Sequence, residues 1–104
     1  MLKITVLIPT KYNDGSPIGP GVLKLLLSGL REITGGYTLD CIVEGRYTMD
    51  DGSIATDYSQ KLWVVVDSDK LPAIREWAER VCICLKQESL YLEYQQTNVD
   101  FVRG

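Results

Sequence analysis

The chain of 104 residues contains no histidine, a single phenylalanine and only three cysteines, and it has no surplus of basic side chains. The absence of histidine excludes acid–base catalysis and metal ligation by imidazole. Eleven Lys and Arg against fourteen Asp and Glu leave a formal net charge of -3. Proteins that bind nucleic acids through phosphate contacts usually carry a basic surplus, so we expect no nucleic-acid partner.

Long apolar runs are missing as well. No run approaches the roughly 20 residues that a membrane-spanning helix needs, and no basic start leads into an apolar stretch, as it would in a signal peptide. The cysteines Cys41, Cys82 and Cys84 are odd in number and form a poor disulfide framework, so we interpret them as small buried hydrophobic residues. These absences predict a cytoplasmic protein with no membrane contact, and nothing indicates a metal ion or another cofactor.

The residues that are present give an ordinary globular composition, with 45% hydrophobic and 24% charged side chains. The length suffices for one domain and is too short for two, so we predict a single domain over residues 1–104. A chain of this size buries roughly 60–70% of its unfolded surface, which is enough for a core without disulfides or metal.

Hydrophobic periodicity predicts six main elements along the chain. They are strands over 2–9, 37–47, 53–67 and 90–94, and helices over 23–33 and 71–85. The run Asp50-Asp51-Gly52 predicts a tight hairpin between the second and third strands, because Asp-Gly readily adopts positive φ angles. Gln60 lies on the apolar side of the third strand, which indicates either a bulge or an exposed strand end.

The order strand, helix, strand, strand, helix, strand contains two split βαβ units, and the right-handed crossover rule leaves few arrangements. The commonest is a ferredoxin-like βαββαβ sandwich of the α+β class. Its four-stranded antiparallel sheet has both helices on one face and the spatial order fourth, first, third, second strand. Residues 99–102 can add a short fifth strand at one edge.

Two helices on one face would leave the other face of the sheet open. Alternation places on it Lys3, Thr5, Leu7, Asp40, Ile42, Glu44, Arg46, Lys61, Trp63, Val65, Tyr91 and Glu93. Its apolar centre consists of Leu7, Ile42, Trp63 and Val65. Because such patches mark interfaces and symmetric dimers are the commonest oligomers, we predict a homodimer joined face to face. The alternative is a monomer in which a loop or the C-terminal tail covers the face.

Few residues point to chemistry. Asp50 and Asp51 are explained by turn propensity next to Gly52. The loop over 12–21 has glycines but lacks the Lys-Ser/Thr ending of a phosphate-binding loop, so an ordinary connection and a substrate-covering loop both stay open. Glu88 lies at a helix-to-strand junction and is a binding candidate, although hydrogen bonds that fix the chain there are the simpler interpretation.

Trp63 and Tyr91 are the aromatic binding candidates on the open face. Exposed rings on a sheet can stack bases, but the glycine-and-aromatic signature of RNA-recognition domains is absent. A carboxylate held against Trp63 in a dry cavity would bind its proton more tightly and could act as a general base. This enzyme hypothesis requires an enclosed pocket lined by Trp63, Tyr91 and a buried acid.

Short motifs in the second half resemble a family of small uncharacterised bacterial domains. The motifs are Gly45-Arg46-Tyr47, Gly52-Ser53-Ile54-Ala55-Thr56-Asp57-Tyr58-Ser59, Gln87-Glu88-Ser89 and Val99-Asp100-Phe101. In that family, a strand ending in Gly-x-aromatic precedes a Gly-x-aliphatic-x-x-acid-x-Ser return strand. This chain has Tyr47 where tryptophan is usual and Asp57 where glutamate is usual. The resemblance covers residues 45–102, supports the fold and implies no established activity.

Within these motifs, Asp57 and Ser59 share one face of their strand, and Arg46 is expected across the hairpin. We interpret Arg46 and Asp57 as an ion pair, with a small polar binding site as the alternative. The candidate binding residues are Arg46, Asp57, Ser59, Trp63, Tyr91 and Glu88.

The leading functional hypothesis is a non-enzymatic interaction or small-molecule-binding module that self-associates through the open face. The alternative is a small cofactor-free enzyme, monooxygenase- or isomerase-like, of the dimeric ferredoxin-like type, which rests on fold analogy. No residue is singled out as catalytic.

Overall fold

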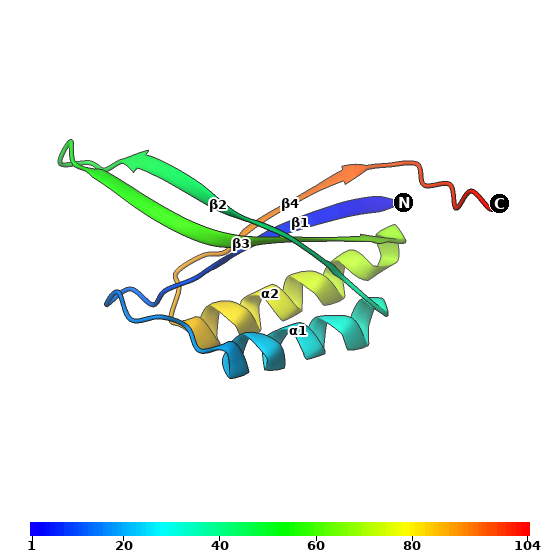
Figure 1. Cartoon of the computed structure of the whole chain (residues 1–104), viewed down its shortest axis with the longest axis horizontal. Helices are drawn as coiled ribbons and strands as arrows, with labels where there is room; N and C mark the ends of the chain where they lie inside the picture. Colours follow the sequence, from blue (N-terminus) through cyan, green and yellow to red (C-terminus); the bar gives the residue numbers. More distant parts are fainter.

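The computed structural model describes all residues 1–104, and its elements follow the predicted order. They are β1 (Leu2–Pro9), α1 (Pro20–Thr34), β2 (Thr38–Thr48), β3 (Ile54–Val66), the 3-10 turn η1 (Ser68–Lys70), α2 (Leu71–Leu85) and β4 (Tyr91–Gln96). The sheet is antiparallel in the order β2-β3-β1-β4. Both helices cover the same face of it (Figure 1). This is the predicted ferredoxin-like α+β sandwich.

Each helix has a proline in its first turn and ends at a residue with left-handed backbone geometry. Pro20 and Pro72 occupy the starts, where the missing N–H has no helical partner to lose. Gly35 (φ 81°) and Lys86 (φ 55°) follow the two ends. Helix α1 begins three residues before the predicted start at residue 23, because its exposed first turn carries no apolar periodicity.

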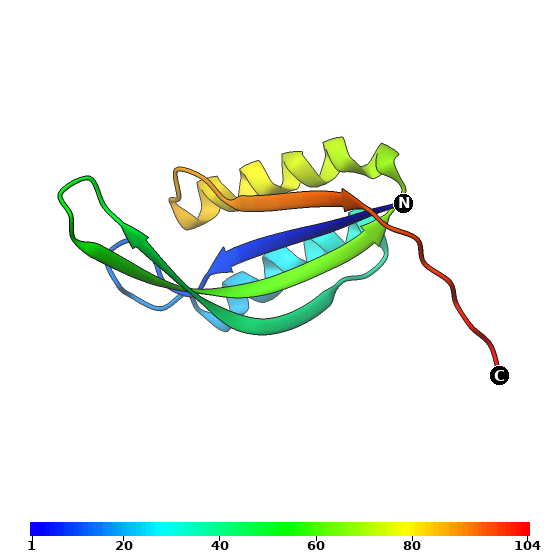
Figure 2. The same cartoon turned by 90° about the horizontal axis from the view of Figure 1, so that it is seen from above.

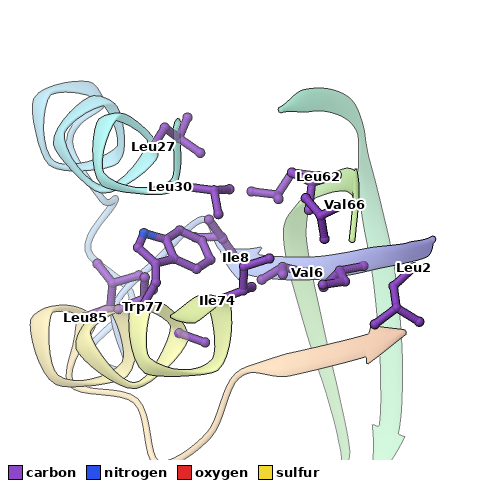
Figure 3. Close-up of a cluster of buried hydrophobic side chains, with 14 residues drawn as sticks. Leu2, Val6, Ile8, Leu27, Leu30, Leu62, Val66, Ile74, Trp77 and Leu85 are labelled. Carbon is purple, nitrogen blue, oxygen red and sulfur yellow. The ribbon is translucent and has the colours of Figure 1, made fainter. Parts of the chain in front are cut away.

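The core lies between the helices and the covered face of the sheet (Figure 3). Alternate residues of β1 and β3 point into it, and Ile4 and Leu62 are fully buried. The indole Nε1 of Trp77 in α2 donates a hydrogen bond to the carbonyl oxygen of Leu26 in α1 at 2.9 Å. The ring is itself buried, so this hydrogen bond gives the indole N–H a partner inside the core. The same bond joins the two helices.

A β-bulge in β2 determines which side chains lie on which side of the sheet. The register shifts between Leu39 and Ile42, so that Asp40 and Cys41 of β2 oppose Lys61 of β3 alone. The backbone N–H of Cys41 donates to the Asp40 carboxylate at 2.8 Å. One extra residue on one strand reverses the alternation of every residue beyond it.

The bulge overturns part of the predicted open face. Paired residues on neighbouring strands share a side, and Ile42 pairs with Gln60, which alternates with the core residues of β3. The prediction that Ile42, Glu44 and Arg46 lie on the open side is therefore wrong, because all three lie on the helix side. The open side of this stretch carries Val43, Gly45 and Tyr47 instead.

Beyond the helices, β2 and β3 continue as a two-stranded hairpin, which we call the outer ribbon (residues 43–58; Figure 1). β1 pairs with β3 only from Ser59 to Val66, so this part of the sheet has no third strand. At its tip, the Asp51 carboxylate accepts hydrogen bonds from Ser53 N–H at 2.9 Å and Ser53 Oγ at 2.6 Å. Gly52 has a φ of 85°, as the predicted turn requires.

Two further predictions are wrong. Residues 97–104 form no fifth strand, and the segment points away from the body of the molecule (Figure 2). Cys41 and Cys84 are exposed, because Cys41 lies in the bulge of an edge strand and Cys84 lies on the solvent side of α2; Cys82 alone is partly buried. No helix in the structure combines the length and apolar character needed to cross a membrane.

Candidate functional site

The face of the sheet that no helix covers, which we call the open face, is formed by β1, β3 and β4. Its side chains are Lys3, Thr5, Leu7, Pro9, Ser59, Lys61, Trp63, Val65, Tyr91, Glu93 and Gln95. Thr5 on the central strand pairs with Trp63 on one side and Glu93 on the other. Directly opposed side chains lie close together, so Thr5 is 5% exposed although no helix lies above it. The open face is therefore already packed at its centre.

Trp63 is the largest side chain on this face, and it is half-buried. The ammonium group of Lys3 lies 4.8 Å from the centroid of the indole ring. A cation over an exposed aromatic ring contributes about 0.5–1 kcal/mol. The contact places the flat, electron-rich face of the indole next to the positive charge of Lys3. Such a surface suits a protein interface or the stacking of an aromatic ligand.

Charged groups of both signs surround the apolar centre. The Lys61 ammonium lies 3.8 Å from the Asp40 carboxylate, and both side chains are more than a third exposed, so water screens the pair. The pKa of Asp40 is lowered, first by the hydrogen bond from the Cys41 N–H and then by Lys61.

On β4, the Tyr91 hydroxyl donates to the Glu93 carboxylate at 2.9 Å, and this bond raises the pKa of Tyr91. The raised pKa keeps the Tyr91 hydroxyl protonated at neutral pH, so it remains a hydrogen-bond donor to Glu93.

The predicted binding residues fall into separate groups. Ser59, Trp63 and Tyr91 lie on the open face of the body, while Asp57 continues the same side of β3 into the outer ribbon. Arg46 lies on the opposite side and pairs with Glu44, with 3.5 Å between Nε and Oε2. The expected Arg46–Asp57 pair does not form, because the bulge has turned Arg46 away.

Glu88 is exposed and makes no hydrogen bond, so it does not fix the junction before β4. Its neighbour Gln87 does so: Gln87 Nε2 donates to the Leu85 carbonyl at 3.1 Å and to Asn13 Oδ1 at 3.3 Å. Asn13 Nδ2 donates in turn to the Lys86 carbonyl at 3.1 Å. The loop after β1 is thus anchored to the end of α2. The polar run around Gln87 was the only sequence signal for this contact.

Three surface hollows lie away from Trp63 and Tyr91. One of about 290 Å³ lies between α2 and β4, one of about 460 Å³ lies beside the loop after β1, and one of about 110 Å³ lies near Ile8. The hollow beside the loop is lined by Tyr12, Asn13, Asp14, Ser16, Cys84 and Lys86. No three His, Cys, Asp or Glu side chains are grouped as metal ligands would be. None of these three hollows is lined by Trp63 or Tyr91.

Comparison with known proteins gives no sequence-level relative: no protein-family model and no curated protein matches the chain. Solved structures do match. CutA1 from the psychrotrophic bacterium Shewanella sp. SIB1 is 16% identical over 96% of this chain and 83% of its own, with a TM-score of 0.70. A divalent cation tolerance protein (Cut A1) from Thermus thermophilus is 13% identical over 97% of this chain and 88% of its own, with a TM-score of 0.67.

A phage SAM lyase in complex with S-methyl-5'-thioadenosine is also similar. It is 14% identical over 91% of this chain and 80% of its own, with a TM-score of 0.65. These likenesses show the fold. At such low identity, they do not allow the role of any residue to be transferred from one protein to the other. The resemblance of residues 45–102 to small uncharacterised bacterial domains stays a prediction.

Proposed function

We propose that the protein is an interaction or ligand-binding module that forms a homodimer through the open face. The observation that supports this most is the position of Trp63, half-buried at the centre of a sheet face that no helix covers. Leu7 and Val65 share that face with it and are also only partly covered. A second copy would remove this apolar surface from water, as isologous interfaces do.

The charges around the centre are compatible with such pairing. Lys3 and Lys61 supply positive charge, and Asp40 and Glu93 supply negative charge on the same face. A two-fold axis can place the basic side chains of one copy against the acidic side chains of the other. The three free cysteines fit a reducing compartment, and a location in the bacterial cytoplasm is part of the proposal.

The test is the solution mass measured by light scattering for the wild type, Trp63→Glu and Leu25→Glu. Leu25 lies on the outer surface of α1 and is 73% exposed, so it controls for a new surface charge. We expect the wild type and Leu25→Glu to have the same oligomeric mass, and Trp63→Glu to have half of it. Circular dichroism checks that Trp63→Glu is folded. A wild type that stays monomeric at high concentration would overturn the proposal.

A second candidate function is a cofactor-free enzyme that cleaves S-adenosylmethionine. The observation that favours it is the likeness to the phage SAM lyase, which spans 91% of this chain. S-methyl-5'-thioadenosine keeps the methyl and adenosyl groups of S-adenosylmethionine, so its release breaks the bond from sulfur to the γ carbon of the amino-acid chain. The electron pair of that bond stays on sulfur, and the carboxylate of the same substrate forms the new bond to the γ carbon, which closes a lactone and needs no other reactant. Trp63 and Tyr91 could stack the adenine, and Glu93 could attract the sulfonium cation.

This candidate is tested by incubating the protein with S-adenosylmethionine and measuring S-methyl-5'-thioadenosine by chromatography. An enzyme would give product above the rate without protein, and Glu93→Gln would lower that rate at least tenfold. Product formation at the uncatalysed rate at high protein concentration would exclude the lyase. That result would leave the dimer proposal intact, because the two experiments have separate readouts.

A further inference from the structure

A groove runs between α2 and β4, and we call it the edge groove. It has a volume of about 290 Å³ and is open to solvent. Its apolar lining comes from Ala78, Cys82, Leu90, Leu92 and Tyr94. β4 is the last strand in the sheet order, so one of its edges has no neighbour. Unpaired backbone groups next to an apolar groove can accept an added strand from another chain.

The segment after β4, residues 98–104, is the most exposed apolar segment of the chain. Phe101 is 81% exposed and Val102 is 87% exposed, and Val99 is exposed as well. The last backbone hydrogen bond of this region runs from Thr97 N–H to the Met1 carbonyl at 3.0 Å. Segments that stay free in solution are poor in aromatic and β-branched residues. This one holds the only phenylalanine of the protein.

The segment and the groove are complementary. In an extended chain, Val99, Phe101 and Arg103 point to the same side. Two of these three are apolar and the third is basic, while the groove is mainly apolar and also contains the acidic Glu79 and the basic Arg75. We propose that residues 98–103 of a second copy dock in the edge groove along β4, with Phe101 on the apolar lining and Arg103 near Glu79.

A second copy fits better than the same chain. The segment bends after the end of β4 and extends away from the body (Figure 2). To enter its own groove, the chain would have to reverse directly after Gln96, and residues 96–99 contain neither the Asn-Gly nor the Asp-Gly pair that favours a tight two-residue turn. The hydrogen bond at Thr97 also holds the chain in line with β4. A copy related by a two-fold axis needs no reversal and makes the contact twice.

The contact is tested first with a fluorescein-labelled peptide of residues 97–104 and a chain that lacks residues 98–104. The removed residues make no contact with the core, so the shortened chain is expected to fold. Fluorescence anisotropy is expected to show saturable binding. A peptide with Phe101→Ala should bind about tenfold more weakly or worse, and Cys82→Arg in the groove should weaken the binding of the unchanged peptide. The absence of saturable binding would overturn the proposal.

The second test asks whose segment occupies the groove, and it uses the full chain. Light scattering is performed in the Trp63→Glu background, which removes the association proposed for the open face and so keeps the two proposals distinguishable. We expect a dimer that Phe101→Glu converts to a monomer. Val102→Glu, one residue on and equally exposed, points to the other side and should leave the dimer intact. A full chain that stays monomeric while its shortened form binds the peptide would mean that each segment occupies its own groove, which contradicts the proposal.

Discussion

The inner and outer halves of β3 have the same alternation but different surroundings. The inner half, from Ser59 to Val66, lies between β1 and β2 under the helices, and Leu62 on its covered side is fully buried. The outer half pairs with β2 alone, and Ile54 on the same side is 68% exposed. Whether the side chains on the helix side of β3 are buried therefore depends on the third strand and on the helices. The alternation within β3 does not decide it.

The sharpest test of this comparison is the cost of truncating an apolar side chain in each half. Leu62→Ala is expected to lower the free energy of unfolding by about 2–5 kcal/mol, because it leaves a cavity in a closed core. Ile54→Ala should change it by less than about 0.5 kcal/mol. Urea denaturation followed by circular dichroism at low protein concentration measures both. Equal costs would mean that the outer ribbon is also covered.

A smaller effect is expected at Gly45 in the outer ribbon. A Cβ at this position would lie 2.5 Å from the Tyr47 hydroxyl oxygen, so the aromatic ring lies directly over the glycine. Gly45→Ala must displace the exposed ring and should destabilise the protein by about 0.5–1 kcal/mol.

The matched control is the same substitution in a Tyr47→Ala chain. There the obstacle is gone, and the added methyl group should cost nothing. Unfolding free energies of the four proteins give the coupling between the two residues. Equal costs of Gly45→Ala in both backgrounds would show that the ring leaves the glycine in solution.

The sequence predicts the inner region much better than the outer one. Alternation in β1 and the apolar stripes of the helices define the core directly, and the crossover rule then gives the strand order. Trp63 and Tyr91 are placed on the open face because β3 and β4 contain no bulge. The bulge at Asp40 and Cys41 carries no glycine or proline, so the positions of Ile42, Glu44 and Arg46 could not be inferred.

One residue did signal the bulge. Gln60 interrupts the apolar side of β3, and its side-chain amide donates to the Asp40 carbonyl at 2.8 Å and to the Lys61 carbonyl at 2.9 Å. A polar residue in that place satisfies backbone groups that the irregular register leaves without strand partners. The sequence shows the glutamine, but only the pairing shows which strand holds the extra residue.

The two sides of α2 offer a chemical version of the same comparison. Burial raises the pKa of Cys82, and the nearby Glu79 carboxylate raises it further, whereas Cys84 is exposed. Because the thiolate is the reactive form, iodoacetamide at pH 8 should modify Cys84 on the order of ten times faster than Cys82. Mass spectrometry of the peptides over time measures both rates. The Cys82 rate should rise only at a pH above the ordinary range of a thiol, and a rise within that range would contradict the assignment.

The smallest effect is expected at the ribbon tip. The two hydrogen bonds from Ser53 lower the pKa of Asp51 below its ordinary value. A carboxyl group with a lowered pKa in the folded state stabilises the turn above its unfolded pKa, and this contribution is lost as the pH falls through the folded value. NMR titration of the Asp51 carboxyl should show the lowered pKa, and Ser53→Ala should return it toward the ordinary range. An unchanged titration in Ser53→Ala would show that the turn does not use these bonds.

The extra residue in β2 also affects how this chain can be compared with other sequences. Deletion of Asp40 or Cys41 would leave the composition almost unchanged, yet it would exchange the two sides of the hairpin from residue 42 to the turn. An alignment without a gap at this point can therefore match residues that face opposite directions in the two proteins. A one-residue gap at this point means that the two proteins present different side chains on the same side of the ribbon. The position of the gap should be taken from the strand pairing before the ribbon residues of the two proteins are aligned.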